Sequence, residues 1–274
     1  MRNRKWIKLI LPILITLMLF FCLTACSPNG KQSQNDEDTT ENIQTDNVEK
    51  NTDTDQLSNF EKKSIKTADT DNFNYWLYTP KNATDNMPLI IYLHGGSGKG
   101  DDLDIVIENG FPKFLKNGEL GEISAYIAIP QVSSSFRGWS ELKQSVKSLI
   151  DYAKINYKID EHKVSLTGHS MGGTGTWSIA AAFPTLFCRI MPLSGSVQNT
   201  PTNIKALGNI SIWAFVGSAD TIVDPQTSID FVGALSSQGK NARVTILSEA
   251  THFDVPELVY LSKEYKAIDW LING

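Results

Sequence analysis

Residues 168–172, Gly-His-Ser-Met-Gly, constrain the fold of this chain more than any other segment. They follow the apolar run 164–167 and precede a stretch of mostly small residues, 173–182, that is compatible with a helix. A strand that enters a helix through G-x-S-x-G must turn sharply, and the glycines let the neighbouring backbones approach closely. Such a turn presents the serine hydroxyl beside a helix N-terminus, which favours negative charge. The pattern predicts that Ser170 is a nucleophile at the edge of a sheet.

The rest of residues 65–274 alternates between apolar strands and helices. Strands are predicted at residues 73–79, 88–94, 123–130, 163–167, 188–193, 210–217 and 242–247. Helices are predicted at residues 140–157, 171–183, 225–237 and 256–272, with one or two short helices in 102–115. Apolar strands that alternate with helices are typical of a mostly parallel sheet covered on both faces. We therefore predict an α/β domain. Only about fifteen residues separate the strands at 188–193 and 210–217, so we expect no large cap domain and an open site.

Two other strand ends carry side chains that can cooperate with Ser170. Reactive groups in a parallel sheet gather beyond the carboxyl ends of its strands. The strand at 210–217 is followed by Asp220, and the strand at 242–247 is followed by His252. An imidazole can accept the proton of an attacking serine, and a carboxylate can hold that imidazole in the required tautomer. The chain order serine, acid, histidine is that of the α/β-hydrolases. We predict that Ser170, Asp220 and His252 form a catalytic triad.

A glycine-rich segment after the strand at 88–94 predicts an oxyanion hole. Negative charge develops on the substrate carbonyl oxygen during acyl transfer, and two backbone N–H groups are needed to stabilise it. Met171 directly follows the nucleophile and supplies one N–H group, while Gly96 is placed to supply the other. We interpret His94 as a brace for the glycine-rich loop and His169 as a packing residue.

Several residues compete for these roles. Asp224 is the main alternative to Asp220, but it precedes a proline that can begin a helix, so we interpret it as a helix cap. Ser194 and Ser196 end a neighbouring strand without the pattern of a nucleophile turn. Trp139 follows a strand end, and the sequence leaves open whether it anchors its loop or contacts the substrate.

These segments resemble, in their order along the chain, a group of bacterial α/β-hydrolases. The matching motifs are His94-Gly95-Gly96, Ile129-Pro130-Gln131, Gly168 to Gly173 with Trp177, Phe183-Pro184 with Phe187, and Gly217 with Asp220. The group comprises predicted peptidases, carboxylesterase-like enzymes and polyhydroxybutyrate-depolymerase-like or feruloyl esterases. The resemblance covers roughly residues 70–270 and implies an α/β-hydrolase fold with the five catalytic and oxyanion roles given above. One departure is that residues 251–254 lack the aromatic-rich sequence that often follows the family's histidine.

The residues and the resemblance together favour a serine hydrolase of carboxylic esters that acts through an acyl-enzyme. Acetyl, feruloyl or short acyl esters, including esters on polysaccharides, are the expected substrates. A serine peptidase or an acyltransferase with the same triad, and a substrate-binding lipoprotein, stay open as alternatives. We expect no cofactor or metal, because the chain has no C-x-x-C motif or Cys/His cluster. No basic segment interleaved with aromatic residues points to nucleic acid as a partner, and the net charge of −5 argues only for solubility. We expect a monomer.

Residues 1–25 have the pattern of a signal peptide: a basic start, an apolar run of about fifteen residues, and small residues at its end. That run is short for a bilayer span of ~20 residues. Leu23-Thr24-Ala25-Cys26 resembles the lipobox of bacterial lipoproteins, so Cys26 is predicted to carry lipid. Residues 26–64 are polar and nearly free of aromatics, which predicts a disordered tether. We therefore expect a secreted lipoprotein, tethered to the outer face of the bacterial cell membrane.

Overall fold

The computed structural model describes residues 57–273, and within them eight strands form one sheet in the order β1-β2-β4-β3-β5-β6-β7-β8. The strands are β1 (Phe60–Ile65), β2 (Phe73–Tyr78), β3 (Met87–Leu93), β4 (Tyr126–Pro130), β5 (Ile159–His169), β6 (Arg189–Leu193), β7 (Ser211–Gly217) and β8 (Ala242–Leu247). β2 pairs antiparallel with β1 and β4, and every other pair is parallel. The sheet is the mostly parallel one that the sequence predicts.

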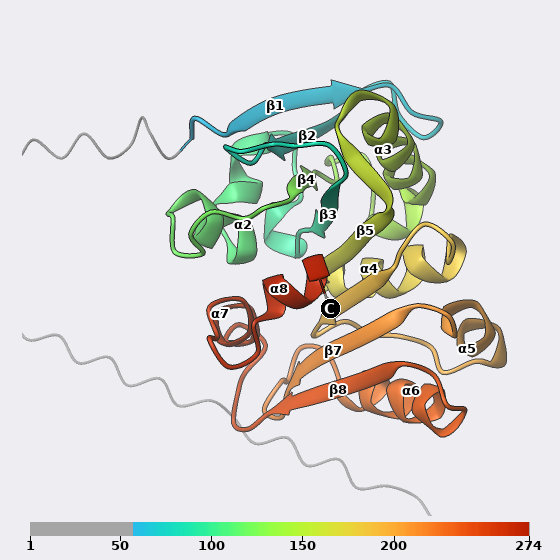
Figure 1. Ribbon diagram of the computed structural model, residues 1–274. Helices are drawn as coiled ribbons and strands as arrows, with labels where there is room; N and C mark the ends of the chain where they lie inside the picture. The colour runs from blue at the N-terminus through green and yellow to red at the C-terminus, as the bar shows by residue number, and fades with distance from the viewer. Residues whose placement is uncertain (1–56, 274) are drawn as a thin grey trace, which may run out of the picture. The chain divides into compact units, whose positions relative to one another are not determined.

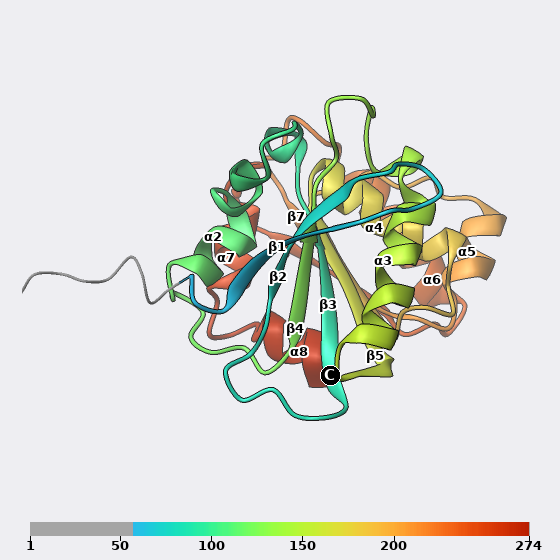
Figure 2. The ribbon, with the colours of Figure 1, turned by 90° about the horizontal axis from the view of Figure 1, so that it is seen from above.

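Helices cover both faces of this sheet (Figures 1 and 2). They are α2 (Gly110–Lys116), α3 (Lys143–Asn156), α4 (Met171–Ala182), α5 (Pro201–Leu207), α6 (Gln226–Ser237), α7 (Val255–Tyr260) and α8 (Ala267–Asn273). Three short 3-10 helices are η1 (Gly96–Gly98), η2 (Leu103–Ile107) and η3 (Trp139–Glu141). Helices α3, α4, α5 and α6 contribute to one hydrophobic core, whereas α2, α7 and α8 contribute to the other. The prediction of an α/β fold is confirmed.

The continuous apolar character of the central strands follows from this two-sided burial. In β3, Leu89 and Ile91 pack into the core beneath α3 and α4, while Ile90 and Tyr92 pack into the core beneath α2 and α7. All four side chains are almost fully buried. Because neither face of the strand meets water, an alternation of polar and apolar residues is not required.

The structure corrects the predicted elements in three places. The boundary at residue 65 is wrong, because β1 begins at Phe60 inside the predicted tether and pairs with β2. Helix α5 was not predicted; it begins after Thr200, whose hydroxyl accepts a hydrogen bond from the N–H of Asn203. The predicted helix 256–272 is two helices, α7 and α8. The turn between them ends at Lys266, whose φ of 48° is incompatible with a continuous right-handed helix.

The predicted signal peptide, residues 1–25, and the lipid-bearing Cys26 lie outside the described residues. Among residues 57–273, no helix combines the length and the apolar character that crossing a bilayer demands.

Removal of β1 should destabilise the domain. The Phe60 ring packs edge-on against Trp76 and Tyr78, and loss of β1 leaves the outer edge of β2 unpaired. We expect a chain that begins at Lys66 to melt roughly 5–10 °C below one that begins at Asp55. Differential scanning calorimetry of the two chains tests this, and equal melting temperatures would show that β1 adds nothing to the folded domain.

Candidate active site

Ser170 lies in a strained turn between β5 and α4. Its φ of 59° and ψ of −119° fall in a region that non-glycine residues rarely adopt. The N–H of Ser170 donates to the carbonyl oxygen of Leu193 at the end of β6, at 2.9 Å. Two residues further on, a Cβ on Gly172 would lie 1.9 Å from the carbonyl oxygen of Leu93. Only glycine permits this close approach of α4 to β3.

His252 and Asp220 form a buried pair at the ends of β8 and β7. The imidazole Nδ1 donates to Oδ2 of Asp220 at 2.7 Å. The other carboxylate oxygen, Oδ1, accepts hydrogen bonds from the N–H groups of Ile222 and Val223, each at 2.9 Å. With Nδ1 carrying the proton, the other ring nitrogen of His252 is an acceptor, which is the tautomer that a general base requires.

The pKa of Asp220 is lower than that of an ordinary aspartate. Burial is the largest single influence and raises the pKa, but the hydrogen bonds from Val223, His252 and Ile222 together outweigh it. The carboxylate is therefore ionised at neutral pH. A buried carboxylate in contact with an imidazole stabilises the positive charge that the ring gains when it accepts a proton.

Main-chain hydrogen bonds join the loop that carries Asp220 to the loop that carries His252. The N–H of Ala219 donates to the carbonyl oxygen of Ala250 at 3.0 Å, and the N–H of Glu249 donates to the Ser218 hydroxyl at 2.8 Å. A Cβ on Gly217 would lie 2.3 Å from that Ala250 oxygen. The glycine at the end of β7 lets the two loops cross in contact.

Asp224 takes the role of a helix cap, as predicted. Its side chain is exposed and accepts a hydrogen bond from the N–H of Gln226 at the start of α6, at 2.9 Å. The imidazole of His252 contacts Asp220 instead. Of the two aspartates, the structure therefore places Asp220 beside the histidine.

The oxyanion loop after β3 is built around His94. Nε2 of this ring accepts a hydrogen bond from the N–H of Val132, so Nδ1 carries the proton and donates to the carbonyl oxygen of Gly95. Burial lowers the pKa of His94 to about 4, and the hydrogen bond to Gly95 offsets only part of this effect. A neutral ring thus braces the loop, as the sequence indicated.

Trp139 does not lie where a substrate contact requires it. The side chain is 1% exposed, and its Nε1 donates to the carbonyl oxygen of His94 at 3.0 Å. The indole also packs against the His94 ring, with 4.9 Å between centroids. Of the two interpretations that the sequence left open, the structure supports the loop anchor and corrects the assignment of Trp139 as a substrate-binding residue.

Gln131 is a support of the oxyanion loop whose role the sequence did not reveal. Its buried side-chain amide donates to the carbonyl oxygens of Gly98 and Asp102, at 3.0 and 2.7 Å. The two acceptors lie on both sides of the turn that follows η1. Gln131 follows β4, so the position of the loop depends on the neighbouring strand.

The predicted oxyanion donors are free to bind a ligand. Among the described residues, no hydrogen-bond acceptor contacts the N–H group of Gly96 or of Met171, and the Ser170 hydroxyl has no partner either. Met171 begins α4, where unpaired N–H groups and the helix dipole favour negative charge. Gly96 lines the cavity around Ser170, and Met171 directly follows Ser170 in the chain.

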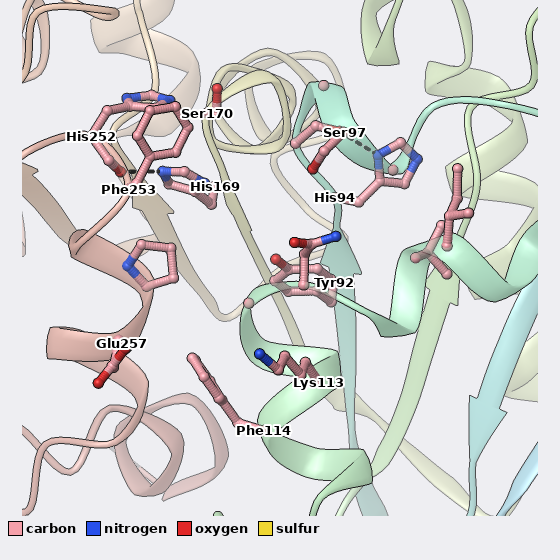
Figure 3. A pocket seen from close by; sticks show the side chains of 18 of the residues that line it. Tyr92, His94, Ser97, Lys113, Phe114, His169, Ser170, His252, Phe253 and Glu257 are labelled. Atoms are coloured by element: carbon pink, nitrogen blue, oxygen red, sulfur yellow. Dashed lines mark hydrogen bonds between the residues drawn. The ribbon is translucent and has the colours of Figure 1, made fainter. Parts of the chain in front are cut away.

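Ser170 and His252 open onto one cavity of about 420 Å³ (Figure 3). It extends from these two residues between α2 and α7, toward the side chains of Lys113 and Glu257. None of its lining residues comes from 194–210, the segment between β6 and β7. Many α/β-hydrolases insert a lid at that point, so the cavity lacks this kind of cover within the described chain.

His169, predicted to be a packing residue, also contacts His252 directly. Its Nε2 donates to the backbone carbonyl of His252 at 2.8 Å, and the two rings lie 4.6 Å apart between centroids (Figure 3). Burial, reinforced by the neighbouring His252, lowers the pKa of His169 to about 4. A neutral imidazole thus links the turn that carries Ser170 to the loop that carries His252.

Ser194 and Ser196, the two serines that end a neighbouring strand, do not line the cavity of Ser170. Ser194 is buried with a φ of 43°, and within the described residues its hydroxyl has no partner. Ser196 lines a separate groove with Thr174, to which its N–H is bonded. Neither serine lies at the start of a helix.

A model of the dienelactone hydrolase family matches residues 121–259, which contain Ser170, Asp220 and His252. A bifunctional acetylxylan esterase/xylanase of Neocallimastix patriciarum is 28% identical over 154 residues, which cover 55% of this chain and 22% of that protein. An acetylxylan esterase of Coprinopsis cinerea is 28% identical over 127 residues, which cover 42% of this chain and 33% of that protein. The matched parts of this chain thus span 22% and 33% of the length of these two curated relatives.

Two solved structures share the fold. A thermostable esterase aligns with a TM-score of 0.64 at 24% identity, over 78% of this chain and 63% of that chain. A feruloyl esterase module from Clostridium thermocellum, solved with sinapinate, aligns with a TM-score of 0.57 at 17% identity. The latter match covers 77% of this chain and 87% of that chain. These likenesses confirm the α/β-hydrolase fold, and the match to the family model confirms the resemblance found in the sequence.

The low pKa values of His94 and His169 predict a stability that falls in acid. Between pH 6.5 and about 4, the unfolded chain binds protons at these rings while the folded chain does not. Each ring should therefore reduce the free energy of unfolding by roughly 1.4 kcal/mol per pH unit as pH falls through that range. The stability that Asp220 contributes is lost only in stronger acid, as pH falls below the ordinary aspartate pKa of 3.8 and through the lowered pKa of the folded state.

Urea unfolding between pH 4.5 and 7.5 measures this dependence. His169→Gln should reduce the slope of unfolding free energy against pH, because one of the two buried rings no longer takes part. His162→Gln, at a ring with 87% of its side chain exposed, is the matched control and should keep the wild-type slope. A His169→Gln slope equal to that of wild type would contradict the prediction.

Proposed function

This chain belongs to the dienelactone hydrolase family, and we propose that it is a serine carboxylesterase whose triad is Ser170, His252 and Asp220. One observation carries the proposal above the others. A buried imidazole, held by an ionised carboxylate, opens onto the same cavity as a serine in a strained turn. Activation of a serine hydroxyl needs that combination of groups.

The proposed reaction has two balanced halves. Oγ of Ser170 attacks the ester carbonyl while Nε2 of His252 takes the hydroxyl proton, and the resulting oxyanion binds the N–H groups of Gly96 and Met171. The tetrahedral intermediate collapses, and His252 returns its proton to the departing alcohol. Water then attacks the acyl-enzyme with the same base, which releases the acid and restores the Ser170 hydroxyl. Asp220 stays ionised throughout and stabilises the imidazolium.

We propose acyl esters on polysaccharides as the substrates, with acetyl groups first among them. The names of the relatives and the open cavity both support this class, because an ester on a polymer must reach the serine without passing through a closed lid. Feruloyl and other short acyl groups belong to the same proposal. A peptidase and an acyltransferase would use the same groups, and they differ only in the leaving group or in the acceptor of the acyl group.

The esterase proposal is tested by hydrolysis of p-nitrophenyl acetate, methyl ferulate, acetylated xylan and short peptides. We expect acid release from the esters, none from the peptides, and no transfer to added alcohols. Ser170→Ala should abolish turnover with an unchanged melting temperature. Asp220→Asn should lower kcat by about 10⁴, because an amide can hold the wrong tautomer of the imidazole.

Asp224→Asn is the matched control for Asp220→Asn and should lower the rate less than tenfold, because it weakens only a helix cap. An Asp224 variant less active than the Asp220 variant would mean that the acid is misassigned. Ester hydrolysis that survives in Ser170→Ala would reject the triad altogether, and absence of any hydrolysis in wild type would favour the binding-protein alternative.

We also propose that Cys26 carries lipid and tethers a monomeric enzyme to the outer face of the bacterial cell membrane. The motif Leu23-Thr24-Ala25-Cys26 at the end of an apolar run supports it. Cells grown with labelled palmitate should label the wild-type protein but not Cys26→Ala. Cys22→Ala is the matched control and should label like wild type, because Cys22 lies in the segment that is cleaved away. Undiminished label in Cys26→Ala would overturn the proposal.

A further inference from the structure

Two large apolar side chains that line the catalytic cavity are exposed to solvent. Phe253 is 77% exposed, and Ile222 is 63% exposed. Both residues line the same cavity as Ser170 and His252. Exposed apolar side chains that gather at a cavity indicate contact with a ligand more often than those scattered singly. Neither side chain takes part in the proposed chemistry.

The backbones of both residues belong to the turns that hold the triad. Phe253 directly follows His252, and its ring packs edge-on against the imidazole with 5.4 Å between centroids (Figure 3). The N–H of Ile222 donates to Oδ1 of Asp220. The hydrogen bonds that orient the triad therefore also fix these two backbones relative to the reacting atoms.

The direction of proton transfer determines which part of an ester lies next to Phe253 and Ile222. The substrate carbonyl oxygen must face the N–H groups of Gly96 and Met171, while the departing alcohol oxygen must come within hydrogen-bond reach of His252. The alcohol portion of the ester consequently lies on the histidine side of the cavity. Phe253, in contact with the imidazole, and Ile222 are the exposed apolar residues of that side.

We infer that Phe253 and Ile222 form the subsite for the alcohol part of the substrate, and that this subsite takes a pyranose ring. The inference rests on the proposed esterase function and specifies its alcohol. A pyranose has one apolar C–H face and a rim of hydroxyl groups, so it can cover an exposed aromatic ring while its hydroxyls stay in water. An exposed aromatic face suits a sugar, whereas an alkyl chain gains most from enclosure on all sides.

The test compares two esters of the same acid with the full-length protein. Acetylated xylotriose places a sugar over the subsite, whereas the alcohol of ethyl acetate is too small to cover Phe253. In Phe253→Ala, the ratio of kcat/KM for acetylated xylotriose to kcat/KM for ethyl acetate should fall at least tenfold, mainly through KM. Phe253→Trp should restore the ratio, because the indole offers another flat aromatic face. Ile155→Ala, at a residue that is 83% exposed on α3, is the control and should keep the wild-type ratio.

Each outcome either supports or overturns the subsite formed by Phe253 and Ile222. An unchanged ratio in Phe253→Ala, with wild type active on the acetylated sugar, overturns the subsite and leaves the esterase proposal standing. Wild type that hydrolyses ethyl acetate but not acetylated xylotriose overturns both the subsite and the polysaccharide substrates. If Phe253→Ala does not fold, as judged by circular dichroism, Ile222→Ser gives the second measurement, and an unchanged ratio there likewise overturns the inference.

Discussion

The contact between the start of α4 and the end of β3 is the constraint on which the catalytic geometry depends. Gly172 lies so close to the carbonyl oxygen of Leu93 that no larger residue fits. That contact fixes the helix N-terminus, and with it the N–H of Met171, against the strand that leads directly into Gly96. The two predicted oxyanion donors are therefore positioned relative to one another by backbone packing, before any side chain contributes.

Hydrogen bonds to main-chain carbonyls extend this rigidity to the loops that carry Asp220 and His252. Ala219 and Ala250 tie the two loops together, and His169 ties the turn of the nucleophile to the carbonyl of His252. The nucleophile and base loops are thus joined through a hydrogen-bonded imidazole rather than through an exposed ion pair, whose geometry is weakly held in water. A site arranged in this way needs little reorganisation when charge develops.

The sequence predicted the features that local patterns determine. It did not predict those that depend on contacts between distant segments. The turn at Ser170 and the strand ends that carry the predicted triad could be predicted because glycine spacing and apolar runs are local signals. Gln131 and His169 gave no such signal, since their roles depend on which carbonyl of another loop lies nearby. β1 was missed because its sequence, FEKKSI, carries charged residues, as an edge strand can. The sequence does not distinguish the two roles of Trp139, because an aromatic residue after a strand can either anchor its loop or contact a substrate.

The neutral state of His169 has a consequence for the proposed chemistry. In the transition state His252 becomes positively charged, and the His169 ring lies 4.6 Å from it. A positive charge on His169 would oppose that step by about 4 kcal/mol at an effective dielectric constant near 20. This energy corresponds to a rate loss of roughly 10³. Burial lowers the pKa of His169 to about 4, so near pH 7 the ring can hold the carbonyl of His252 without adding that charge, and the negative charge of Asp220 acts on the imidazolium without opposition from this neighbour.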